Sequence, residues 1–403
     1  MDSERIILNQ TVVVHGDRIT HVGPADRVEI PDGALRIDGT DQFLLPGLAE
    51  MHGHVPPMTA PREFIDSVLM LYVATGITTV RGMLGWPDQL ELRAETNRGD
   101  LIAPTLYLAG PSFNGNSISS PEQADQRVRE HAAEGWDLLK IHPGLTRAEY
   151  DAMANAARES SITFGGHIPA DVGLDHALRM GQRSIDHLDG YLEYMDGFNG
   201  PVSDAQLAEV VEMTKAAGTW VVPTMALWEV LFGVADLDEL MSYPELKYMP
   251  PNQVNSWRNQ HVQRQSNPNF NEAAAQQAID NRNRLLGALN DGGAGILMGT
   301  DAPQQFSVPG FSLHRELEVM ASVGMSPYDI LKSGTANVGD YFQGYDAFGR
   351  IAPGHRADLI LTAANPLEDI GNLQEQRGVM LRGRWLPQSA IDAELDKIAA
   401  RYE

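Results

Sequence analysis

FLLPGLAEMHGHVPP, residues 43–57, joins an apolar run to a pair of histidines. The run at residues 43–48 leads into His52 and His54, which are separated by one residue. In an extended strand, residues i and i+2 project from the same face, so the two imidazoles are expected side by side. Two adjacent imidazoles are a natural half of a metal site, although two surface histidines in a Gly/Pro-rich turn would give the same pattern. The other ligands must come from elsewhere in the sequence.

Seven more apolar runs of strand length follow. They are GITTVRGM, PTLYLAG, LLKIH, ITFGGH, SIDHL, WVVPTM and ILMGTD, within residues 76–301. Helical patterns fill most of the gaps, for example at residues 62–75, 122–135 and 147–161. Eight strands alternating with helices predict an α/β fold of the (β/α)₈ TIM-barrel type.

The two ends of the chain have a different pattern. Residues 1–41, including PDGALRIDG at 31–39, and residues 348–390 have the pattern of short strands with turns. We expect them to join into a small β-sandwich domain outside a barrel at 42–347, with a C-terminal helix at 391–403. A long insertion at about 226–295 either shapes the substrate mouth or forms a peripheral helical region for oligomer contacts.

Composition limits the function. The 403 residues are 43% hydrophobic and 21% charged, as in an ordinary globular protein, and carry a net charge of −24. This charge argues against nucleic acid or an anionic membrane as a partner. The expected partners are a small-molecule substrate and further copies of the chain. The lack of cysteine excludes disulfides, thiolate zinc ligands and cysteine nucleophiles.

The first residues, MDSERIIL, lack the basic start and apolar core of an export signal. The sequence as it stands therefore predicts a cytoplasmic protein, and an export signal upstream of Met1 would make it periplasmic or secreted. No run approaches the roughly 20 apolar residues needed to cross a bilayer.

Candidate metal ligands stand at the ends of five of the eight predicted strands. They are His52, His54, Lys140, His167, His187 and Asp301. In a parallel barrel these strand ends converge on one rim, where barrel enzymes keep their active sites. A single histidine at a strand end is more often structural, but the full ordered set predicts a metal centre.

Four other residues are candidate substrate contacts, each with an alternative role. Arg81 could bind a substrate carboxylate or pair with a rim acid. Tyr191 could donate to a developing oxyanion or simply pack. His142 could touch substrate or fill the barrel top, and His314 is either a substrate or supporting residue or a surface histidine at a helix start.

Several motifs together resemble the amidohydrolase superfamily, in its imidazolonepropionase-like and prolidase-like branch. They are PGLAEMHGH, GITTVRGM, DLLKIH, GGHIP, SIDHLDG, GTDAP and GRIAPGHRADLILTAANPLEDI. The resemblance covers essentially the whole chain. It departs at Glu50, where many members have aspartate, and in the first strand of the small domain, which is largely absent.

The resemblance implies a metal-dependent hydrolase acting on carbon–nitrogen bonds, with two divalent ions, zinc being the expected metal. It places His52 and His54 on one ion and His167 and His187 on the other. Lys140 matches a lysine that binds carbon dioxide as a carbamate and bridges the ions, whereas a plain Lys140 would pair with a carboxylate. Asp301 matches the aspartate that binds the first ion and handles the proton.

Two ions would activate a water molecule and polarise a carbonyl, with Asp301 as general base and then acid. We expect hydrolysis of an amide bond in a small substrate, such as a dipeptide (Xaa-Pro-like) or an N-acyl amino acid. The alternatives on the same scaffold are a lactonase, a cyclic amide hydrolase or a mononuclear deaminase. A non-catalytic scaffold is disfavoured because every ligand position is filled.

Overall fold

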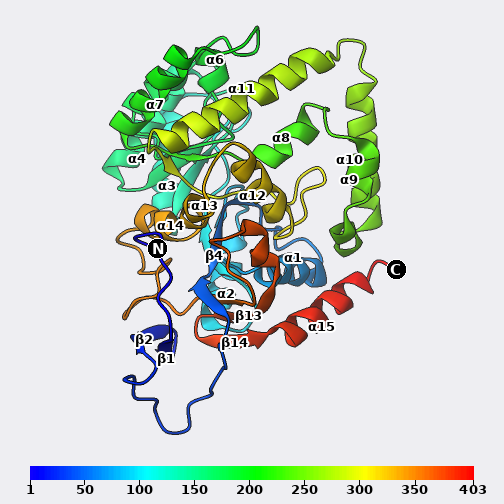
Figure 1. The fold of residues 1–403 in the computed structure, drawn as a ribbon. Helices are drawn as coiled ribbons and strands as arrows, with labels where there is room; N and C mark the ends of the chain where they lie inside the picture. Colours follow the sequence, from blue (N-terminus) through cyan, green and yellow to red (C-terminus); the bar gives the residue numbers. More distant parts are fainter.

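Eight parallel strands lie at the centre of the molecule in a computed structural model that describes residues 1–403 (Figure 1). They are β4 (Leu48–Gly53), β5 (Ile77–Gly82), β6 (Thr105–Leu108), β7 (Leu138–Ile141), β8 (Thr163–Gly166), β9 (Ser184–Asp186), β10 (Trp220–Val222) and β11 (Gly295–Ile296). The strands form one sheet in the order β4-β5-β6 and another in the order β11-β10-β9-β8-β7. Each predicted apolar run contains one of these strands, except that ILMGTD begins at the second residue of β11.

Backbone hydrogen bonds join the two sheets at both edges. Asp137 N–H, just before β7, donates to Leu108 O of β6 at 3.0 Å, and past the end of β6 Phe113 N–H donates to Lys140 O of β7 at 2.9 Å. At the other edge, Met51 N–H of β4 donates at 2.8 Å to Met298 O, two residues past β11. The predicted α/β barrel architecture is confirmed, and both of its seams carry ladder-like hydrogen bonds.

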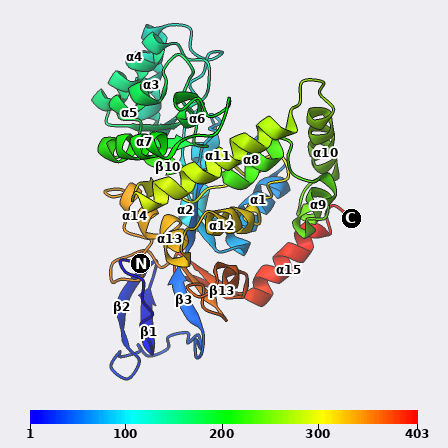
Figure 2. The same ribbon diagram turned by 45° about the horizontal axis from the view of Figure 1, so that its top comes forward.

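The helices between these strands begin and end at recognisable caps. The helices predicted at 62–75, 122–135 and 147–161 are α1 (Arg62–Ala74), α3 (Pro121–Glu134) and α4 (Arg147–Glu159). The Ser120 hydroxyl accepts from Gln123 N–H at the start of α3, and Thr146 forms a capping box with Glu149 at the start of α4. Figure 2 shows α3, α4, α5 and α7 grouped along the outside of the strands. Apart from the helices between β10 and β11 and the last helix, which are described below, the other α-helices are α2 (Gln89–Arg98), α5 (Leu174–Arg179), α6 (Tyr191–Tyr194), α7 (Asp204–Ala217), α12 (Ser312–Ser322), α13 (Pro327–Ser333) and α14 (Ala336–Tyr341).

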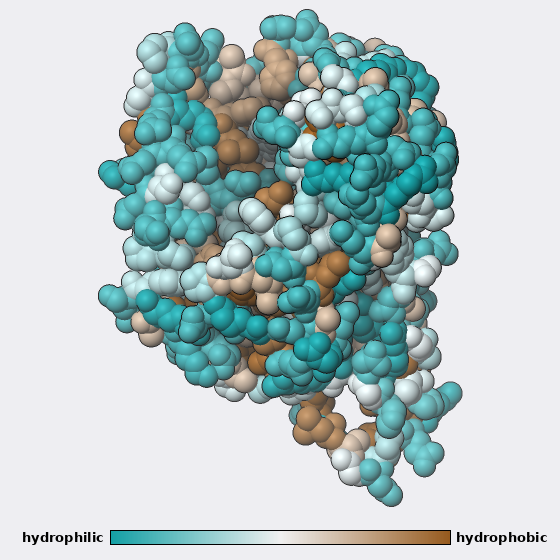
Figure 3. All heavy atoms as spheres, turned by 180° about the vertical axis from the view of Figure 1, so that it is seen from behind, coloured by the Kyte–Doolittle hydropathy of each residue, from teal (hydrophilic) through white to brown (hydrophobic).

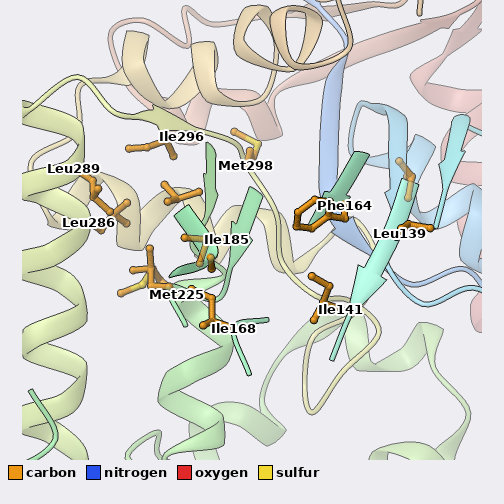
Figure 4. Packing of buried hydrophobic residues seen from close by; sticks show 14 of the residues in the cluster. Leu139, Ile141, Phe164, Ile168, Ile185, Met225, Leu286, Leu289, Ile296 and Met298 are labelled. Carbon is orange, nitrogen blue, oxygen red and sulfur yellow. The ribbon is translucent and has the colours of Figure 1, made fainter. Parts of the chain in front are cut away.

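The largest hydrophobic core fills the space between strands and helices. In Figure 4, Leu139 and Ile141 of β7 belong to this core, together with Ile296 of β11 and with Leu286 and Leu289 of α11 (Glu272–Asp291). Side chains alternate along a strand, so the residues between the outward-facing ones point into the barrel. On β7 the residue between Leu139 and Ile141 is Lys140, so this strand packs with one face and carries a polar side chain on the other.

Both chain ends contribute to a small antiparallel sheet beside the barrel. Its order is β14-β13-β12-β3, with β3 (Phe43–Pro46) from the N-terminal part and β12 (Leu359–Thr362), β13 (Gln376–Leu381) and β14 (Arg384–Pro387) from the C-terminal part. A separate hairpin, β1 (Gln10–His15) with β2 (Arg18–Pro24), meets the C-terminal part where Ile19 N–H donates to His355 O at 2.9 Å. The last helix, α15 (Gln388–Ala399), packs against α1 and β13.

Two details of the predicted strands are wrong. The run at residues 43–54 is not one strand but two in different sheets, because the chain crosses from the small sheet to the barrel at Gly47. A Cβ at Gly47 would lie 2.2 Å from Thr78 Oγ1, so the crossing requires glycine. PDGALRIDG forms no strand: Leu35 is 79% exposed and has no buried face to pack against. This segment lies in the part that projects from the body in Figures 1 and 3.

The segment at 226–295 has two parts. One consists of α8 (Met225–Leu231) and α11, which pack against each other near the barrel rim (Figure 2). The other consists of α9 (Leu237–Met241), η1 (Pro244–Tyr248) and α10 (Pro251–Gln265), and η1 contacts α15 on the outer side. No helix combines the length and apolar character required to span a bilayer.

Candidate metal centre

The six candidate ligands come together at the C-terminal ends of the strands. His52 and Lys140 lie on β4 and β7, His54 lies just past β4, and His167 and His187 directly follow β8 and β9. Imidazole centroids are 4.3 Å apart for His52 and His187 and 4.6 Å apart for His167 and His187. Lys140 Nζ lies 3.2 Å from His52 Nε2. We call His52, His54, Lys140, His167, His187 and Asp301 the rim cluster.

Asp301 lies at the centre of the rim cluster. Its Oδ1 contacts His54 Nε2 and lies 3.6 Å from His52 Nε2, while its Oδ2 lies 3.8 Å from His187 Nε2. Potential ligand atoms of His52, His187 and Asp301 all lie within 4.8 Å of one another. This spacing is compatible with a bound cation between them.

The backbone is strained where three strands end at the site. His187, Thr224 and Asp301 have φ values of 65°, 49° and 64°, in the left-handed region that non-glycine residues rarely adopt. Such conformations cost of order 1–3 kcal/mol each and tend to cluster at functional sites. Here they turn the chain sharply after β9, β10 and β11.

Three histidines of the rim cluster have a fixed ring orientation. His167 Nδ1 donates to Asp189 Oδ2 at 2.5 Å, and His187 Nδ1 is hydrogen-bonded to Thr224 Oγ1 at 2.8 Å. His52 Nδ1 lies 2.7 Å from Asp186 Oδ2, close enough for an ion-pair contact but outside hydrogen-bond geometry. All three contacts are made at Nδ1 and leave Nε2 available, which is the usual arrangement for a metal-binding histidine. Imidazole nitrogens and a carboxylate are also the donors that zinc and similar ions take, so the cluster fits a metal centre.

The sequence analysis missed Asp186, Asp189 and Thr224. The two aspartates flank His187 in SIDHLDG, which is a usable pattern because acids commonly support metal-binding histidines. Their partners, however, are His52 and His167 on other strands, and only the fold brings them together.

Burial sets the electrostatics of the site. Burial and the nearby charge of Lys140 hold the pKa of His52 well below its usual value, and burial does the same for His187. Both rings are therefore neutral and retain a lone pair. Burial also lowers the pKa of Lys140 to about 8, which increases the neutral fraction of its amine.

Glu50 connects β4 to the segment that carries Asp301. Its carboxylate accepts from His52 N–H at 2.9 Å, from Thr300 N–H at 2.8 Å and from the Thr300 hydroxyl at 2.6 Å. Burial raises the pKa of Glu50 to about 7. Glu50 thus lies behind His52 and supports the backbone of the site.

Arg81 lies beneath the site, where it contacts protein groups. Its Nη2 donates to both carboxylate oxygens of Asp186 at 3.0 and 3.1 Å, and its Nε donates to Met51 O at 2.6 Å. Nη1 donates to Ser184 and Tyr341. The Arg81 side chain is fully buried and pairs with an acid, which is the second of its two predicted roles. We therefore do not retain Arg81 as a candidate substrate contact. Through Asp186, it positions His52.

We predict that Arg81→Met lowers the free energy of unfolding by about 3–5 kcal/mol, because Asp186 would remain buried without its partner. Denaturant unfolding of the metal-loaded protein measures the change. The matched control is Arg98→Gln, which breaks an exposed pair with Asp100 and should cost no more than about 0.5 kcal/mol. Equal stability of Arg81→Met and wild type would show that Asp186 does not need this partner.

The remaining candidates are one neighbour of the rim cluster, His142, and two residues with other surroundings, Tyr191 and His314. The His142 ring is 5.0 Å from the His167 ring, and its buried Nδ1 has no hydrogen-bond partner. Tyr191 is fully buried and its hydroxyl is hydrogen-bonded to Thr214 Oγ1 at 2.7 Å, as a packing tyrosine would be. His314 lines a groove of about 450 Å³ between α12 and η2 (Ile370–Gln374), which no member of the rim cluster lines. We therefore retain only His142 as a candidate substrate contact.

Comparison with known proteins identifies the family. A profile of the amidohydrolase family matches residues 43–386. The curated relative adenine deaminase 3 of Rhizobium meliloti (strain 1021) is 24% identical over 402 residues, covering 94% of this chain and 56% of that protein. Dihydroorotase of Mycobacterium leprae (strain TN) is 28% identical over 233 residues, covering 51% of this chain and 53% of that protein. The chain thus spans about half the length of these curated relatives.

A solved structure of bottromycin amidohydrolase shares the fold, with a TM-score of 0.78 and 23% identity over 98% of this chain and 86% of that one. The family profile covers all eight barrel strands and every residue of the rim cluster. This protein therefore belongs to the amidohydrolase family.

Proposed function

We propose that this protein is a metal-dependent hydrolase that uses two divalent ions to cleave an amide bond in a small substrate, such as a dipeptide (Xaa-Pro-like) or an N-acyl amino acid. The observation that carries the proposal is the convergence of the rim cluster at the barrel's C-terminal rim, around Asp301. The expected homo-oligomer is part of the same proposal and can be tested by light scattering.

The donor set divides between two ions. His52, His54 and Asp301 would hold the first ion, and His167 and His187 the second. Lys140 would bridge them as a carbamate formed with carbon dioxide. Two features support the bridge: Lys140 is fully buried, and the hydrogen-bonding contact of its amine is with His52 Nε2 and not with a carboxylate. An unmodified lysine in that position would add positive charge next to the ions, whereas a carbamate would supply anionic oxygens.

When bound, such ions activate water and polarise the scissile carbonyl. The protein's own part in the chemistry falls to Asp301, whose carboxylate would accept the proton of the attacking water and pass it to the leaving nitrogen. The strained backbone after β11 keeps this carboxylate at the centre of the cluster. His142 would contact the substrate from beside His167.

The similar proteins support two substrate classes. A structure titled as a Xaa-Pro dipeptidase, with a TM-score of 0.68 and 21% identity over 93% of this chain and 94% of that one, shares the fold and is compatible with a dipeptide substrate. The deaminase and dihydroorotase relatives favour the second candidate, a mononuclear deaminase or cyclic amide hydrolase. The compact group of His52, His187 and Asp301 is the observation that supports a single ion.

We predict two equivalents of metal, with zinc as the expected element, in protein purified without chelators. Elemental analysis measures this, and the same preparation should hydrolyse dipeptides or N-acyl amino acids in a screen that also contains lactones, cyclic amides and adenine. His187→Ala should lose metal, whereas the matched control His314→Ala should keep both equivalents. One equivalent together with deaminase activity would favour the second candidate instead.

A further inference from the structure

Arg282 is a buried cation without a partner. It lies on α11, is 2% exposed, and its Nε and Nη2 are buried without hydrogen-bond partners. The guanidinium forms no ion pair and instead stacks 3.9 Å from the ring centroid of Trp228 on α8. A buried charge without a counter-ion destabilises a fold, so such a group commonly serves a ligand.

Arg282 lies beside the rim cluster. Trp228, on which it stacks, has its ring 6.3 Å from the ring of His187. The guanidinium–Trp228 and Trp228–His187 separations together set an upper limit on the distance from the guanidinium to the His187 ring. This limit is roughly the length of three extended residues. Two acids, Asp189, which orients His167, and Glu193, act electrostatically on Arg282 without forming an ion pair with it. Figure 2 shows α8 and α11 adjacent, so both residues come from the same wall.

Trp228 adds a second free donor to this wall. Its indole Nε1 is buried and, like Arg282, has no hydrogen-bond partner. Both groups can only donate, so their complement is an acceptor with negative charge. The guanidinium fork matches the two oxygens of a carboxylate. Because the chain carries a net charge of −24, a local cation favours the binding of an anionic substrate.

We propose that Arg282, stacked on Trp228, binds the carboxylate of the substrate, so that the substrate is an N-acyl amino acid or a short peptide with a free C-terminal carboxylate. This rests on the proposed amide hydrolysis, whose scissile bond would lie at the rim cluster. The carboxylate lies within a few residues of that bond, which limits the substrate to a small molecule.

Paired substrates test the proposal. We compare Ala-Pro and N-acetyl-L-methionine with their C-terminal carboxamides, and follow cleavage of the Ala–Pro or the acetyl–amine bond. The wild type should prefer the acids by about 10- to 100-fold in kcat/KM, as expected for a hydrogen-bonded charge pair. Arg282→Gln should remove this preference, mainly through a higher KM for the acids, and leave the carboxamides nearly unchanged. An equal loss for acids and carboxamides would overturn the proposal, as would a wild type without the preference.

A structural role for Arg282 makes different predictions. If Arg282 serves a ligand, Arg282→Met removes an unpaired buried charge and should melt no lower than the wild type. A large fall in Tm would assign Arg282 to the fold and overturn the proposal. The matched control is Arg284→Gln on the same helix, because Arg284 is paired with Asp204 at 2.5 Å and should not affect substrate choice.

A binding measurement distinguishes a failure of this proposal from a failure of the proposed reaction. If the wild type cleaves none of the pairs, the reaction is wrong, and Arg282 is judged by calorimetry with N-acetylglycine and N-acetylglycinamide. The metal-loaded wild type should bind the acid at least about tenfold more tightly than the amide. Arg282→Gln should bind both alike. Equal binding by the wild type would overturn the proposal.

Discussion

Lys140→Ala should lower kcat/KM by at least about a hundredfold, which corresponds to roughly 3 kcal/mol of transition-state stabilisation. Part of the metal should be lost, and acetate or propionate added to the variant should restore some metal and some activity. The reason is the proposed bridging carbamate. Without it the two proposed ions would lose their shared anionic oxygens, and a short acid could occupy the space that the lysine side chain leaves.

Lys140→Arg distinguishes the carbamate from an ordinary ammonium. Arginine keeps a positive charge but cannot form the carbamate, so it should be as inactive as Lys140→Ala and should not respond to acids. If the site needs only a cation near Asp186, arginine should preserve activity. Lys215→Ala is the matched control, because that exposed lysine pairs only with Glu212 and should change neither metal content nor rate. Full activity of Lys140→Ala with two metals would remove the bridge from the mechanism.

The strands and the rim cluster were predictable because both follow from short-range pattern. Each barrel strand is an apolar run, and each cluster residue lies at or shortly after the end of one. Parallel strands of a barrel place those ends on one rim whatever the loops between them do. The i, i+2 relation of His52 and His54 is equally local, and their rings lie 5.7 Å apart. These features require no knowledge of distant contacts.

The residues that support the rim cluster could not be predicted from short-range sequence pattern. Arg81 lies at the end of an apolar run, like the residues of the rim cluster, yet it is buried and paired with Asp186. Strand position gives the face of a side chain but not its depth in the barrel or its partner. The partner Asp186 comes from β9, and the Tyr341 hydroxyl that also contacts Arg81 comes from α14. Only the barrel fold brings these groups together.

Arg282 was overlooked although its sequence contains a usable pattern. The helix at 272–291 is polar overall, which suggests an exposed helix. Its buried residues, however, include Ile279, Leu285, Leu286 and Leu289, which recur at helical spacing, and Arg282 falls in the same stripe. A charge at the centre of an apolar stripe indicates an inward-facing group. The sequence could have predicted its burial, whereas its stacking on Trp228 depends on how α8 packs.

Asp301→Asn should lower kcat by at least about a hundredfold, because it removes the general base and acid of the proposed reaction. Metal content and KM should change little. Asparagine keeps the size of the side chain and one possible ligand oxygen. It also tolerates the left-handed φ of 64° at this position better than most residues, so the turn after β11 should survive. The substitution therefore changes the proton chemistry with little effect on the backbone.

The alternative is that Asp301 only holds the turn after β11 and the ring of His54. Under that alternative, the main effect of Asp301→Asn should be a lower Tm. The measured kcat should then fall only in proportion to the loss of folded, metal-loaded protein. Measuring kcat, metal content and Tm on one preparation decides between the two, with the exposed Asp291→Asn as matched control. If the variant is metal-loaded and normally stable but has a low kcat, Asp301 acts in proton transfer. Proton transfer stabilises the transition state and not the bound substrate, so its loss lowers kcat. Near-normal turnover in that preparation would exclude Asp301 as the base and would require another acceptor for the proton at the rim.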